Sequence, residues 1–486
     1  MAIATILAHA RETPDKVALV HERGSWSYRA FAGRILAARE VLARQDLGGG
    51  RTAIACIGWL PEAWAHSLAL RSLGFATIAA TDLDALAKLP LGDEGCIVSL
   101  DGAPPPALAG FAARKGWKSI RVAVSAAVPP VAMPKAVPGV AEETADQIIM
   151  TSGTTGLYKL VRRNAAIETA SIAASAAVYG LSATSVAHVG NFPLWTAGGY
   201  RWALATWLAG GTVVFDQGKQ PRLIYPDLNL THLFATPATL AWLLGAPDTA
   251  LRRDDDMRLL VTAGALPRAV ADAAQARLTR RLYTVLASTE ALTLAITPVE
   301  GPEDLRWHRL LPSRVVQVVD DAGEVLPPGR VGQVRARIED GLSGYFGDEV
   351  ATREFFREGF FYPGDLGEFR ADGRLALHGR VSDVINVLGS KIATGPIEQA
   401  LQDGLQVPGV CVLSLPAPSG DEEVHVAIES QRPVARSDLE RLAASQLRLA
   451  AKVHFHVLER LPRNAMGKVV RAELRQVLLA KQSRTR

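Results

Sequence analysis

The segment TSGTTGLYKL, residues 151–160, combines hydroxyl side chains, two glycines and a lysine. The hydroxyl residues are Thr151, Ser152, Thr154 and Thr155, and the glycines are Gly153 and Gly156. Hydroxyl groups and a closely approaching backbone suit the oxygens of a phosphate, and Lys159 adds positive charge. The segment therefore predicts a loop that binds nucleotide phosphates. It is not a P-loop, since no Ser or Thr follows Lys159, and an ordinary flexible turn is the alternative interpretation.

Three further charged residues lie in short segments in the C-terminal half of the chain. Glu290 ends LASTE (286–290), Asp365 lies in YPGDLG, and Lys468 follows a glycine in MGK. Each has a structural interpretation when it is taken alone. Glu290 could start a helix because ALTLAI follows it, Asp365 could belong to a turn, and Lys468 could be a solvated lysine before a basic terminal helix.

The segment at 151–160 resembles TSGTTGxPKG, the signature of the acyl-adenylate-forming superfamily, which includes acyl-CoA synthetases, adenylation domains of peptide synthetases and beetle luciferases. It departs from that signature at Tyr158, where the family has proline, and at Leu160, where glycine is usual. Further blocks that resemble the family follow in its order: TAGALP (262–267), LASTE (286–290), FFYPGDLGEF (360–369), HGRVSDVINVLGSKI (378–392) and LPRNAMGKVVRAEL (461–474). The resemblance therefore covers most of the chain.

The resemblance implies that the chain activates a carboxylic acid with ATP and Mg²⁺. The carboxylate attacks the α-phosphate, pyrophosphate leaves and an acyl-adenylate forms, so anionic groups must approach one another. Lys468 corresponds to the family lysine that contacts the carboxylate and the α-phosphate, and we expect it to be the main catalytic residue. Thr289 would hydrogen-bond the α-phosphate, and Glu290 would hold magnesium, which prefers oxygen ligands.

The same resemblance assigns the residues that hold the nucleoside. Asp365 corresponds to the family aspartate that accepts both ribose hydroxyls, and Arg380 to its ribose or phosphate companion. Gly264 and Ala265 would lie against adenine, since small side chains let the backbone approach a flat base. Leu286 stands where the family usually has Tyr or Phe, so aromatic stacking worth about 0.5–1.5 kcal/mol is lost.

The block NFPLWTAGG (191–199) resembles PLFHxxG, which belongs to the acyl pocket of the family. Trp195 replaces phenylalanine, and Thr196 stands where histidine is common. Adenylation domains for α-amino acids normally have an aspartate in this block and none is present, so we expect a carboxylic acid without an α-ammonium group. The pocket would comprise Trp195, Thr196, Gly199, Gly264, Leu286 and Ser288. Core packing is the alternative interpretation for Trp195.

The resemblance also implies a second half-reaction. A hinge after Arg380, with Ser382 at the pivot position, would let the C-terminal domain rotate between adenylation and thioester formation. Lys391 resembles the block that approaches phosphopantetheine, although Pro396 replaces a frequent glutamate. The chain has no GxDS carrier-protein signature, so the acceptor thiol would belong to coenzyme A or to a separate carrier protein, and the sequence leaves both open.

The apolar pattern predicts the elements that position these residues. Before Leu311, helical periods such as that at 30–45 alternate with β-rich runs, which predicts parallel βαβ units with ligands at the strand ends. After Leu311, shorter alternating runs predict an antiparallel subdomain. The predicted fold class is therefore α/β. A large N-terminal domain (1–380) has parallel or mixed sheets with helices plus a β-rich subdomain, and a small mobile α+β C-terminal domain (381–486) carries the catalytic lysine.

The composition is that of an enzyme-sized protein. The chain has 486 residues, and its 53 Lys and Arg are dispersed among 49 acids with a net charge of +4, so nucleic acid is not an expected partner. Cys56, Cys96 and Cys411 are far apart, which argues against metal ligation by cysteine and suits a reducing cytosol. No secretory leader or transmembrane segment is predicted, and we expect a cytoplasmic location.

The leading hypothesis is an AMP-forming acid:thiol ligase. A second hypothesis, with the same fold, is a free-standing adenylation enzyme that loads a separate carrier protein in specialised metabolism, and consumption of coenzyme A distinguishes the two. A third is a non-catalytic relative that binds nucleotide or an acyl ligand. The departures that favour the third hypothesis are Tyr158, Leu286, Thr196 and Pro396. The retained residues that argue against it are Lys159, Thr289, Glu290, Asp365, Arg380 and Lys468.

Overall fold

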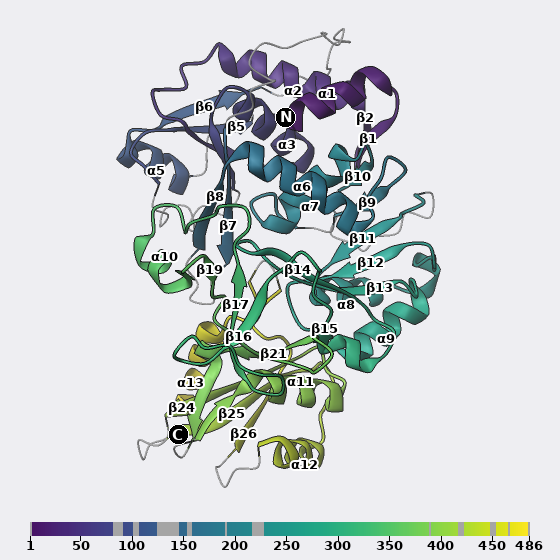
Figure 1. The fold of residues 1–486 in the computed structure, drawn as a ribbon, viewed down its shortest axis with the longest axis vertical. Coiled ribbons are helices and arrows are strands. Elements are labelled where there is room, and N and C mark those ends of the chain that lie inside the picture. The colour runs from purple at the N-terminus through teal and green to yellow at the C-terminus, as the bar shows by residue number, and fades with distance from the viewer. Residues whose placement is uncertain are drawn as a thin grey trace. The chain divides into compact units, whose positions relative to one another are not determined.

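A computed structural model describes residues 2–80, 91–100, 106–123, 145–152, 158–189, 192–215, 228–387, 390–416, 422–447, 453–464 and 467–484 (Figure 1). The chain forms two compact units, Met1–Phe234 with Glu339–Glu354 and Ala235–Ile338 with Phe355–Arg486. Each unit contains helices and strands, which confirms the predicted α/β class. The hinge expected after Arg380 lies inside the second unit and stays a prediction.

The first unit contains a six-stranded sheet with the order β6-β5-β3-β4-β7-β8. Its strands are β3 (Thr52–Cys56), β4 (Ala76–Ala79), β5 (Cys96–Leu100), β6 (Lys118–Val122), β7 (Gln147–Ser152) and β8 (Tyr158–Arg163). α3 (Leu60–Ser72) connects β3 to β4, which pair in parallel, so the predicted βαβ unit is present. β7 and β8 form an antiparallel hairpin at the edge, and α5 (Pro106–Lys115) precedes β6.

A second group of strands in the first unit has the order β11-β9-β10-β1-β2. These strands are β1 (Val17–His21), β2 (Gly24–Ser27), β9 (Val186–His188), β10 (Thr212–Val214) and β11 (His232–Ala235). The helices are α1 (Ala2–Glu12), α2 (Tyr28–Ala43), α6 (Ala165–Tyr179) and α7 (Ala197–Leu208), and α10 begins in the returning segment (Glu349–Phe355). Trp64 of α3 stacks on Tyr200 with ring centroids 5.4 Å apart and meets Trp207 edge to face at 4.9 Å. Aromatic packing therefore joins α3 to α7 in the core.

A buried ion pair joins α2 to α3. Nε of Arg34 donates to Oε1 of Glu62 at 2.5 Å, and Nδ1 of His66 lies 3.3 Å from Oε2 of the same carboxylate. Glu62 is 0% exposed. Because a buried carboxylate has lost its hydration, its partners must compensate for the charge.

The second unit begins with α8 (Pro237–Leu244), η1 (Asp248–Ala250), β12 (Arg258–Val261), α9 (Arg268–Arg277), β13 (Leu282–Ser288), β14 (Leu292–Pro298) and η2 (Pro302–Leu305). A further sheet has the order β15-β21-β20-β17-β19-β18, with β16 paired to β17. Its strands are β15 (Trp307–His308), β16 (Val316–Val319), β17 (Gly332–Arg337), β18 (Phe356–Arg357), β19 (Phe360–Phe361), β20 (Asp365–Phe369) and β21 (Leu375–Arg380). All of these pairings are antiparallel, so the predicted antiparallel subdomain is confirmed.

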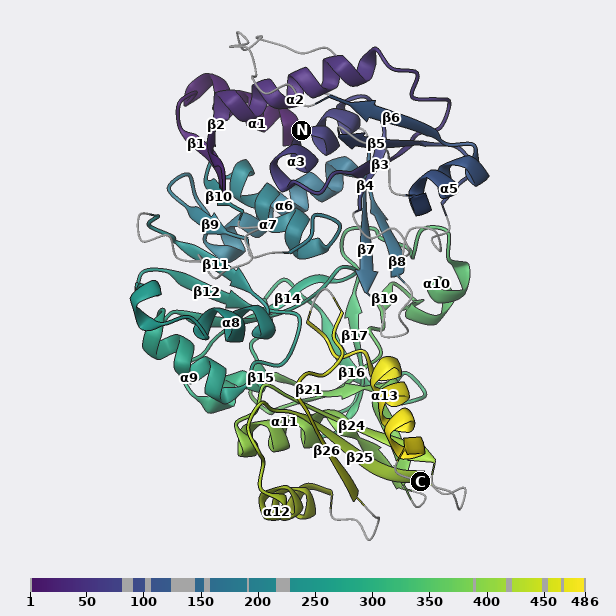
Figure 2. The same ribbon diagram turned by 180° about the vertical axis from the view of Figure 1, so that it is seen from behind.

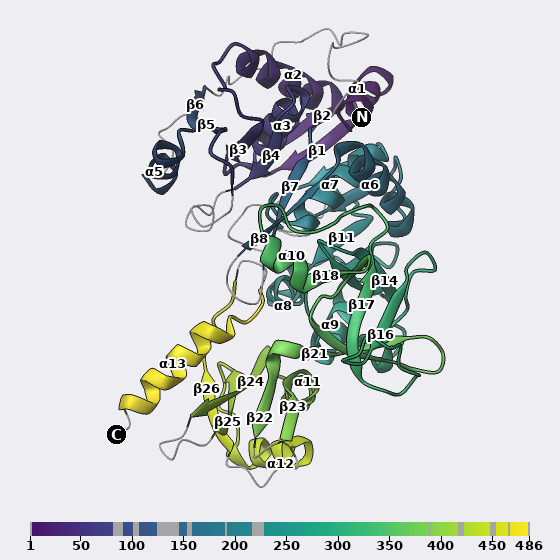
Figure 3. The same cartoon turned by 60° about the vertical axis from the view of Figure 1, so that its left-hand side comes forward.

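The C-terminal part of this unit is a small α+β layer structure. After η3 (Val381–Asp383), its elements are β22 (Val384–Val387), β23 (Ser390–Ala393), α11 (Thr394–Leu405), β24 (Gly409–Pro416), β25 (Glu422–Glu429), α12 (Arg436–Leu447), β26 (Val453–Leu458) and α13 (Arg471–Arg484). α11 and α12 pack on one face of the β24-β25-β26 sheet, and α13 packs on the other (Figure 2, Figure 3). None of the helices in the described ranges, these included, has the length and apolar character that a bilayer crossing requires.

Candidate active site

The predicted phosphate-binding residues belong to the β7–β8 hairpin of the first unit. Residues 153–157, with Gly153, Thr154, Thr155 and Gly156, lie outside the described residues. Ser152 ends β7, and Thr151 pairs with Lys159 across the hairpin. Nζ of Lys159 lies 5.3 Å from the ring centroid of Tyr345, a cation–π contact. The hairpin therefore places a hydroxyl residue beside a cation at the base of the predicted loop.

Two departures from the family pattern, Tyr158 and Trp195, pack against each other. Their rings meet edge to face, with centroids 5.4 Å apart and an interplanar angle of 86°. The carbonyl oxygen of Trp195 accepts a hydrogen bond from N of Met150 at 2.9 Å, which fixes this segment against β7. Trp195 is only 4% exposed and belongs to a hydrophobic core cluster. Most of the surface of Trp195 is therefore packed against the hydrophobic core.

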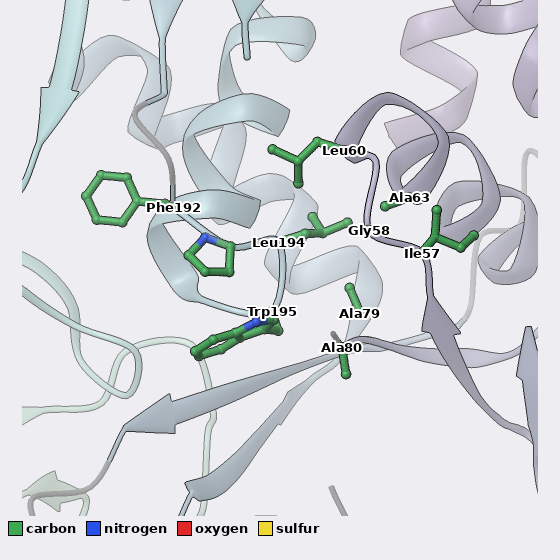
Figure 4. Close-up of a pocket in the computed structure, with 10 residues that line it drawn as sticks. Ile57, Gly58, Leu60, Ala63, Ala79, Ala80, Phe192, Leu194 and Trp195 are labelled. Carbon is green, nitrogen blue, oxygen red and sulfur yellow. The ribbon is translucent and has the colours of Figure 1, made fainter. Parts of the chain in front are cut away.

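The remaining surface of Trp195 lines an apolar cavity of about 290 Å³ (Figure 4). The cavity lies where β3 leads into α3, at the end of β4, and beside the segment 192–195. Its lining residues are Ile57, Gly58, Leu60, Ala63, Ala79, Ala80, Phe192, Pro193, Leu194 and Trp195. Such a lining suits the hydrocarbon part of a ligand.

Thr196 and Gly199 hold the wall of this cavity in place. Thr196 is the N-cap of α7, since its Oγ1 accepts from N of Gly199 at 3.1 Å, and the same hydroxyl donates to O of Pro193 at 2.7 Å. A Cβ at Gly199 would lie 2.2 Å from O of Pro193, so this position needs glycine. Neither Thr196 nor Gly199 is among the described residues that line the cavity, so their contacts give them a positioning role.

In the second unit, Thr289 and Glu290 lie in the turn between β13 and β14. Oγ of Ser288 accepts a hydrogen bond from N of Ala291 at 2.9 Å, which closes the turn. The interpretation of Glu290 as a helix-start acid is wrong, because LTLAI, from Leu292, belongs to strand β14, which pairs with β13. An apolar run of this length is compatible with a helix or with a strand, and pairing with a neighbouring strand determines which of the two forms. Glu290 is 6% exposed.

Asp365 and Arg380 are register partners on β20 and β21. Nε of Arg380 lies 2.7 Å from Oδ1 of Asp365, and the guanidinium also donates to O of Pro363. Loss of solvent raises the pKa of Asp365 above its usual range, although Arg380 and Lys468 act in the opposite direction. The carboxylate is therefore a partly desolvated acceptor beside two cations.

The loop that carries Lys468 has two reciprocal contacts with Asn464. N of Lys468 donates to Oδ1 of Asn464 at 3.0 Å, and N of Asn464 donates to O of Lys468 at 2.9 Å. Gly467 has a φ of +76°, a left-handed conformation that favours glycine. A Cβ there would lie 2.9 Å from Cβ of Ala238 and 3.8 Å from Oγ1 of Thr236. The loop therefore lies against the N-terminus of α8.

The side chain of Lys468 is close enough to Asp365, Glu290 and Arg380 for their charges to interact. Lys468 is exposed to solvent, and partial desolvation by the surrounding protein lowers the pKa of its ammonium below the usual lysine range. The positive charge of Arg380 lowers the pKa further, and Asp365 and Glu290 oppose this. The structure thus brings together four residues that the sequence scatters over 179 positions between Glu290 and Lys468.

The predicted adenine segment, Gly264 and Ala265, is exposed between β12 and α9. Its left-handed residue is Ala263, with a φ of +70°, and not the neighbouring glycine. Oγ1 of Thr262 donates to O of Val285 at 2.8 Å, which ties this segment to β13. Leu286 follows Val285 and is half-buried.

Replacing Leu286 by tyrosine is expected to tighten ATP binding by about 2- to 10-fold, which corresponds to the roughly 0.5–1.5 kcal/mol of an aromatic stacking contact. Isothermal titration with ATP measures this effect. Ala287→Tyr, one residue further along β13, is the matched control because it adds the same ring at the neighbouring position. Equal affinities for both variants and the parent chain would remove Leu286 from the adenine site.

The residues around the predicted hinge form a polar network. Ser382 lies in η3 and its Oγ donates to Oδ1 of Asp383 at 3.2 Å. Asp383 in turn lies 3.2 Å from Nε of Arg471 at the start of α13. Lys391 lies on β23, and its side chain is outside the described part of the chain. Pro396 lies in the first turn of α11, where a missing N–H is tolerated.

Sequence reasoning missed three residues of these sites. The negative charge of Asp383 helps to raise the pKa of Asp365. The position of Asp383 next to Ser382 is the sequence feature that could have pointed to it. Thr236 caps α8 through N of Thr239 at 3.0 Å, a role that its place before a proline could have indicated. Tyr345 has no local sequence signal, because it reaches Lys159 from a distant segment.

A mixed α/β fold with carboxylates and cations gathered at strand ends is typical of nucleotide-binding enzymes. The chain belongs to the family described as AMP-binding enzyme, whose family model matches residues 6–346. This confirms the predicted superfamily.

Two curated relatives and one solved structure illustrate the similarity. The chain is 29% identical over 348 residues to the fatty acid–[acyl-carrier-protein] ligase ScoC of Streptomyces coeruleorubidus, covering 67% of this chain and 66% of the relative. It is 28% identical over 355 residues to a salicylyl-CoA synthase / salicylate adenylyltransferase of a Streptomyces species, covering 68% and 63%. The alignments thus span just under two thirds of these relatives. The O-succinylbenzoate coenzyme A synthetase MenE of Bacillus subtilis, solved with ATP and magnesium ion, shares the fold with a TM-score of 0.78 at 21% identity, covering 97% of this chain and 98% of that chain.

Proposed function

We propose that the protein is an AMP-forming acid:thiol ligase, which joins a carboxylic acid to AMP and then transfers the acyl group to a phosphopantetheine thiol. The observation that carries this proposal is the approach of Lys468 to Glu290, Asp365 and Arg380. A lysine whose charge reaches this group can offset the repulsion between an attacking carboxylate and a phosphate. Membership of the AMP-binding enzyme family supports it.

Lys468 is the proposed catalytic residue of the first half-reaction. Its ammonium offsets the repulsion between the attacking carboxylate and the α-phosphate, and this charge is needed most in the transition state. Thr289, in the adjoining turn, donates to an α-phosphate oxygen. Asp365 accepts hydrogen bonds from the ribose hydroxyls, and Arg380 neutralises the aspartate and contacts the nucleotide.

Glu290 is the proposed magnesium ligand. Its carboxylate is a buried oxygen donor among charged groups, which fits a hard cation that keeps several waters beside substrate phosphates. When bound, magnesium supplies positive charge that stabilises the leaving pyrophosphate. The protein's part is to hold this oxygen in the β13–β14 turn.

The substrate that we propose is a carboxylic acid with an apolar hydrocarbon or aryl group and no α-ammonium group. Among the described residues that line the cavity at Trp195, none is acidic, so a cationic group would lack a partner there. The cavity of about 290 Å³ suits a small acyl group. The names of the two relatives include a fatty acid and salicylate, which are both of this class.

The acceptor is a thiol of coenzyme A or of a separate carrier protein, since the names of the relatives include both. Lys391 on β23 is the proposed contact for the pantetheine arm, and Ser382 is the proposed pivot between the two half-reactions. Measuring coenzyme A consumption with the cognate acid distinguishes the two acceptors.

A pyrophosphate-exchange screen across aliphatic, aryl and amino acids tests the proposal. We expect ATP–pyrophosphate exchange that depends on the added acid, with apolar acids above amino acids. ATP binding without exchange for any acid would contradict catalysis and favour the non-catalytic relative.

The pH profile of exchange is expected to have an alkaline limb below the usual lysine range. The sign follows from the lowered pKa of Lys468: the required ammonium is lost as the pH rises through that lowered value. Lys468→Arg keeps its charge over the same range, so it is expected to move the limb to higher pH even if its maximal rate is lower. Identical alkaline limbs in the two proteins would assign the titration to another group.

A further inference from the structure

A separate group of polar side chains lies on the face of the C-terminal sheet that packs against α13. Figure 3 shows the ribbon of α13 beside the strands of this sheet. Alternate residues of a strand share a face, so Glu423 and His425 share one face of β25, and His454 and His456 share one face of β26. His425 pairs with His454, and Ala427 pairs with His456, in parallel register. Ala427 belongs to the core beneath α13, which places the group on that side of the sheet. We call these four residues the histidine cluster.

The polar atoms of the histidine cluster converge. Glu423, His425 and His454 each offer one ligand atom, and these atoms all lie within 4.8 Å of one another. Nε2 of His454 lies 2.7 Å from Oε2 of Glu423, and Nδ1 of His425 lies 2.9 Å from Nε2 of His456. The ring of His425 stacks with those of His454 and His456, with centroid distances of 4.5 and 5.2 Å.

The residues of the histidine cluster differ in their exposure to solvent. His425 is 1% exposed, whereas Glu423, His454 and His456 are half-buried. An ion could therefore enter from the solvent side and meet a buried nitrogen at the base. The sequence signals were the alternating Glu423 and His425 in EVHVAIES and the alternating histidines in KVHFHVL, which the active site does not use.

We propose that Glu423, His425 and His454 bind a divalent transition-metal ion, with zinc as the expected occupant. Imidazole nitrogens and a carboxylate oxygen form a ligand set that zinc prefers, at about 2.0–2.2 Å from the ion, and three protein ligands leave one position for water. The three ligand atoms already lie within 4.8 Å of one another, so a small closure of the side chains would bring them around an ion.

His456 is the positioning residue of this site. Its Nε2 lies 2.9 Å from Nδ1 of His425, so a hydrogen bond between the two rings orients the imidazole of His425. Burial lowers the pKa of His456, and the neighbouring His454 and Lys481 lower it further. The lysine comes from α13, so this helix contributes to the surroundings of the site.

A bound ion would link β25 to β26, which α12 separates in the sequence. Because the ligands converge only when the sheet has formed, metal binding would favour the folded state by mass action. This role is independent of the proposed ligase chemistry, and its failure would leave that chemistry untouched.

The test uses the full chain, stripped of metal with a chelator and then titrated with Zn²⁺ against a chromophoric competitor. Glu423→Gln keeps the shape of the side chain and removes a ligand charge, and Glu422→Gln is the matched control because its side chain is exposed on the other face. We expect one zinc per chain, an affinity reduced by at least about 100-fold in Glu423→Gln, and no change in Glu422→Gln. His456→Ala is expected to weaken binding by about 10- to 100-fold, as for other residues behind a metal ligand.

Two further readouts separate a built site from loose surface binding. Zinc is expected to raise the melting temperature of the parent chain and of Glu422→Gln but not of Glu423→Gln, and circular dichroism verifies that both variants are folded. Cobalt in place of zinc should give the visible absorption of a four-coordinate ion. Less than one tightly held zinc per chain, or equal affinities for Glu423→Gln and Glu422→Gln, would overturn the proposal.

Discussion

Replacing Lys468 by alanine is expected to lower acid-dependent pyrophosphate exchange by about 100- to 1000-fold, the loss seen when one preorganised donor is removed from a transition-state charge. The charge of the ammonium interacts with those of Asp365, Glu290 and Arg380, and the preceding Gly467 has a left-handed backbone conformation. Alanine removes the charge but none of the backbone hydrogen bonds of that loop. The measurement is the initial rate of exchange at saturating ATP and acid.

Arg460→Ala is the matched control, because Arg460 is an exposed cation on the approach to the same loop. Its exchange rate is expected to equal that of the parent chain. Transfer from a supplied acyl-adenylate to the thiol is expected to survive in Lys468→Ala, since the charge is required where the carboxylate and α-phosphate meet. Equal losses in both half-reactions would contradict the domain rotation that the family resemblance implies, and unchanged exchange would contradict the role of Lys468.

The sequence predicted which segments form helices and strands better than it predicted which strands pair with one another. The βαβ unit around α3 and the antiparallel sheet after Leu311 could be predicted because the apolar period differs between helices, buried strands and half-exposed strands. ALTLAI, after Glu290, was ambiguous because an apolar run of this length suits both elements. Its pairing with β13 decided the outcome, and that pairing is a tertiary contact.

The active-site residues show the same difference between what a local pattern predicts and what strand pairing determines. Asp365 and Arg380 were assigned through family blocks, but their direct pairing depends on the register of β20 and β21, which includes an irregularity after Leu366. A one-residue shift would turn one side chain to the opposite face. Local sequence does not encode such a register, and the same reason hides the histidine cluster, whose members come from two strands that pair only in the folded sheet.

Replacing Arg34 by methionine is expected to destabilise the first unit by about 3–5 kcal/mol, since it leaves the carboxylate of Glu62 buried with much of its compensation removed. Glu62 is 0% exposed, and Nε of Arg34 donates to it at 2.5 Å. Methionine keeps most of the apolar stem of arginine, so the loss reports the charge more than the packing. The urea midpoint measures the effect, followed through the fluorescence of the tryptophans packed on α3.

Arg29→Met is the control on the same helix. Nη2 of Arg29 lies 3.5 Å from Oδ1 of Asp15, but the side chains are 51% and 89% exposed, and such a surface pair contributes about 0–1 kcal/mol. The double variant Arg34→Met with Glu62→Gln is expected to recover part of the stability, because glutamine removes the uncompensated anion. If the double variant were as unstable as the sum of the two single variants, the two side chains would be energetically independent, and the loss in Arg34→Met would have to come from packing between α2 and α3.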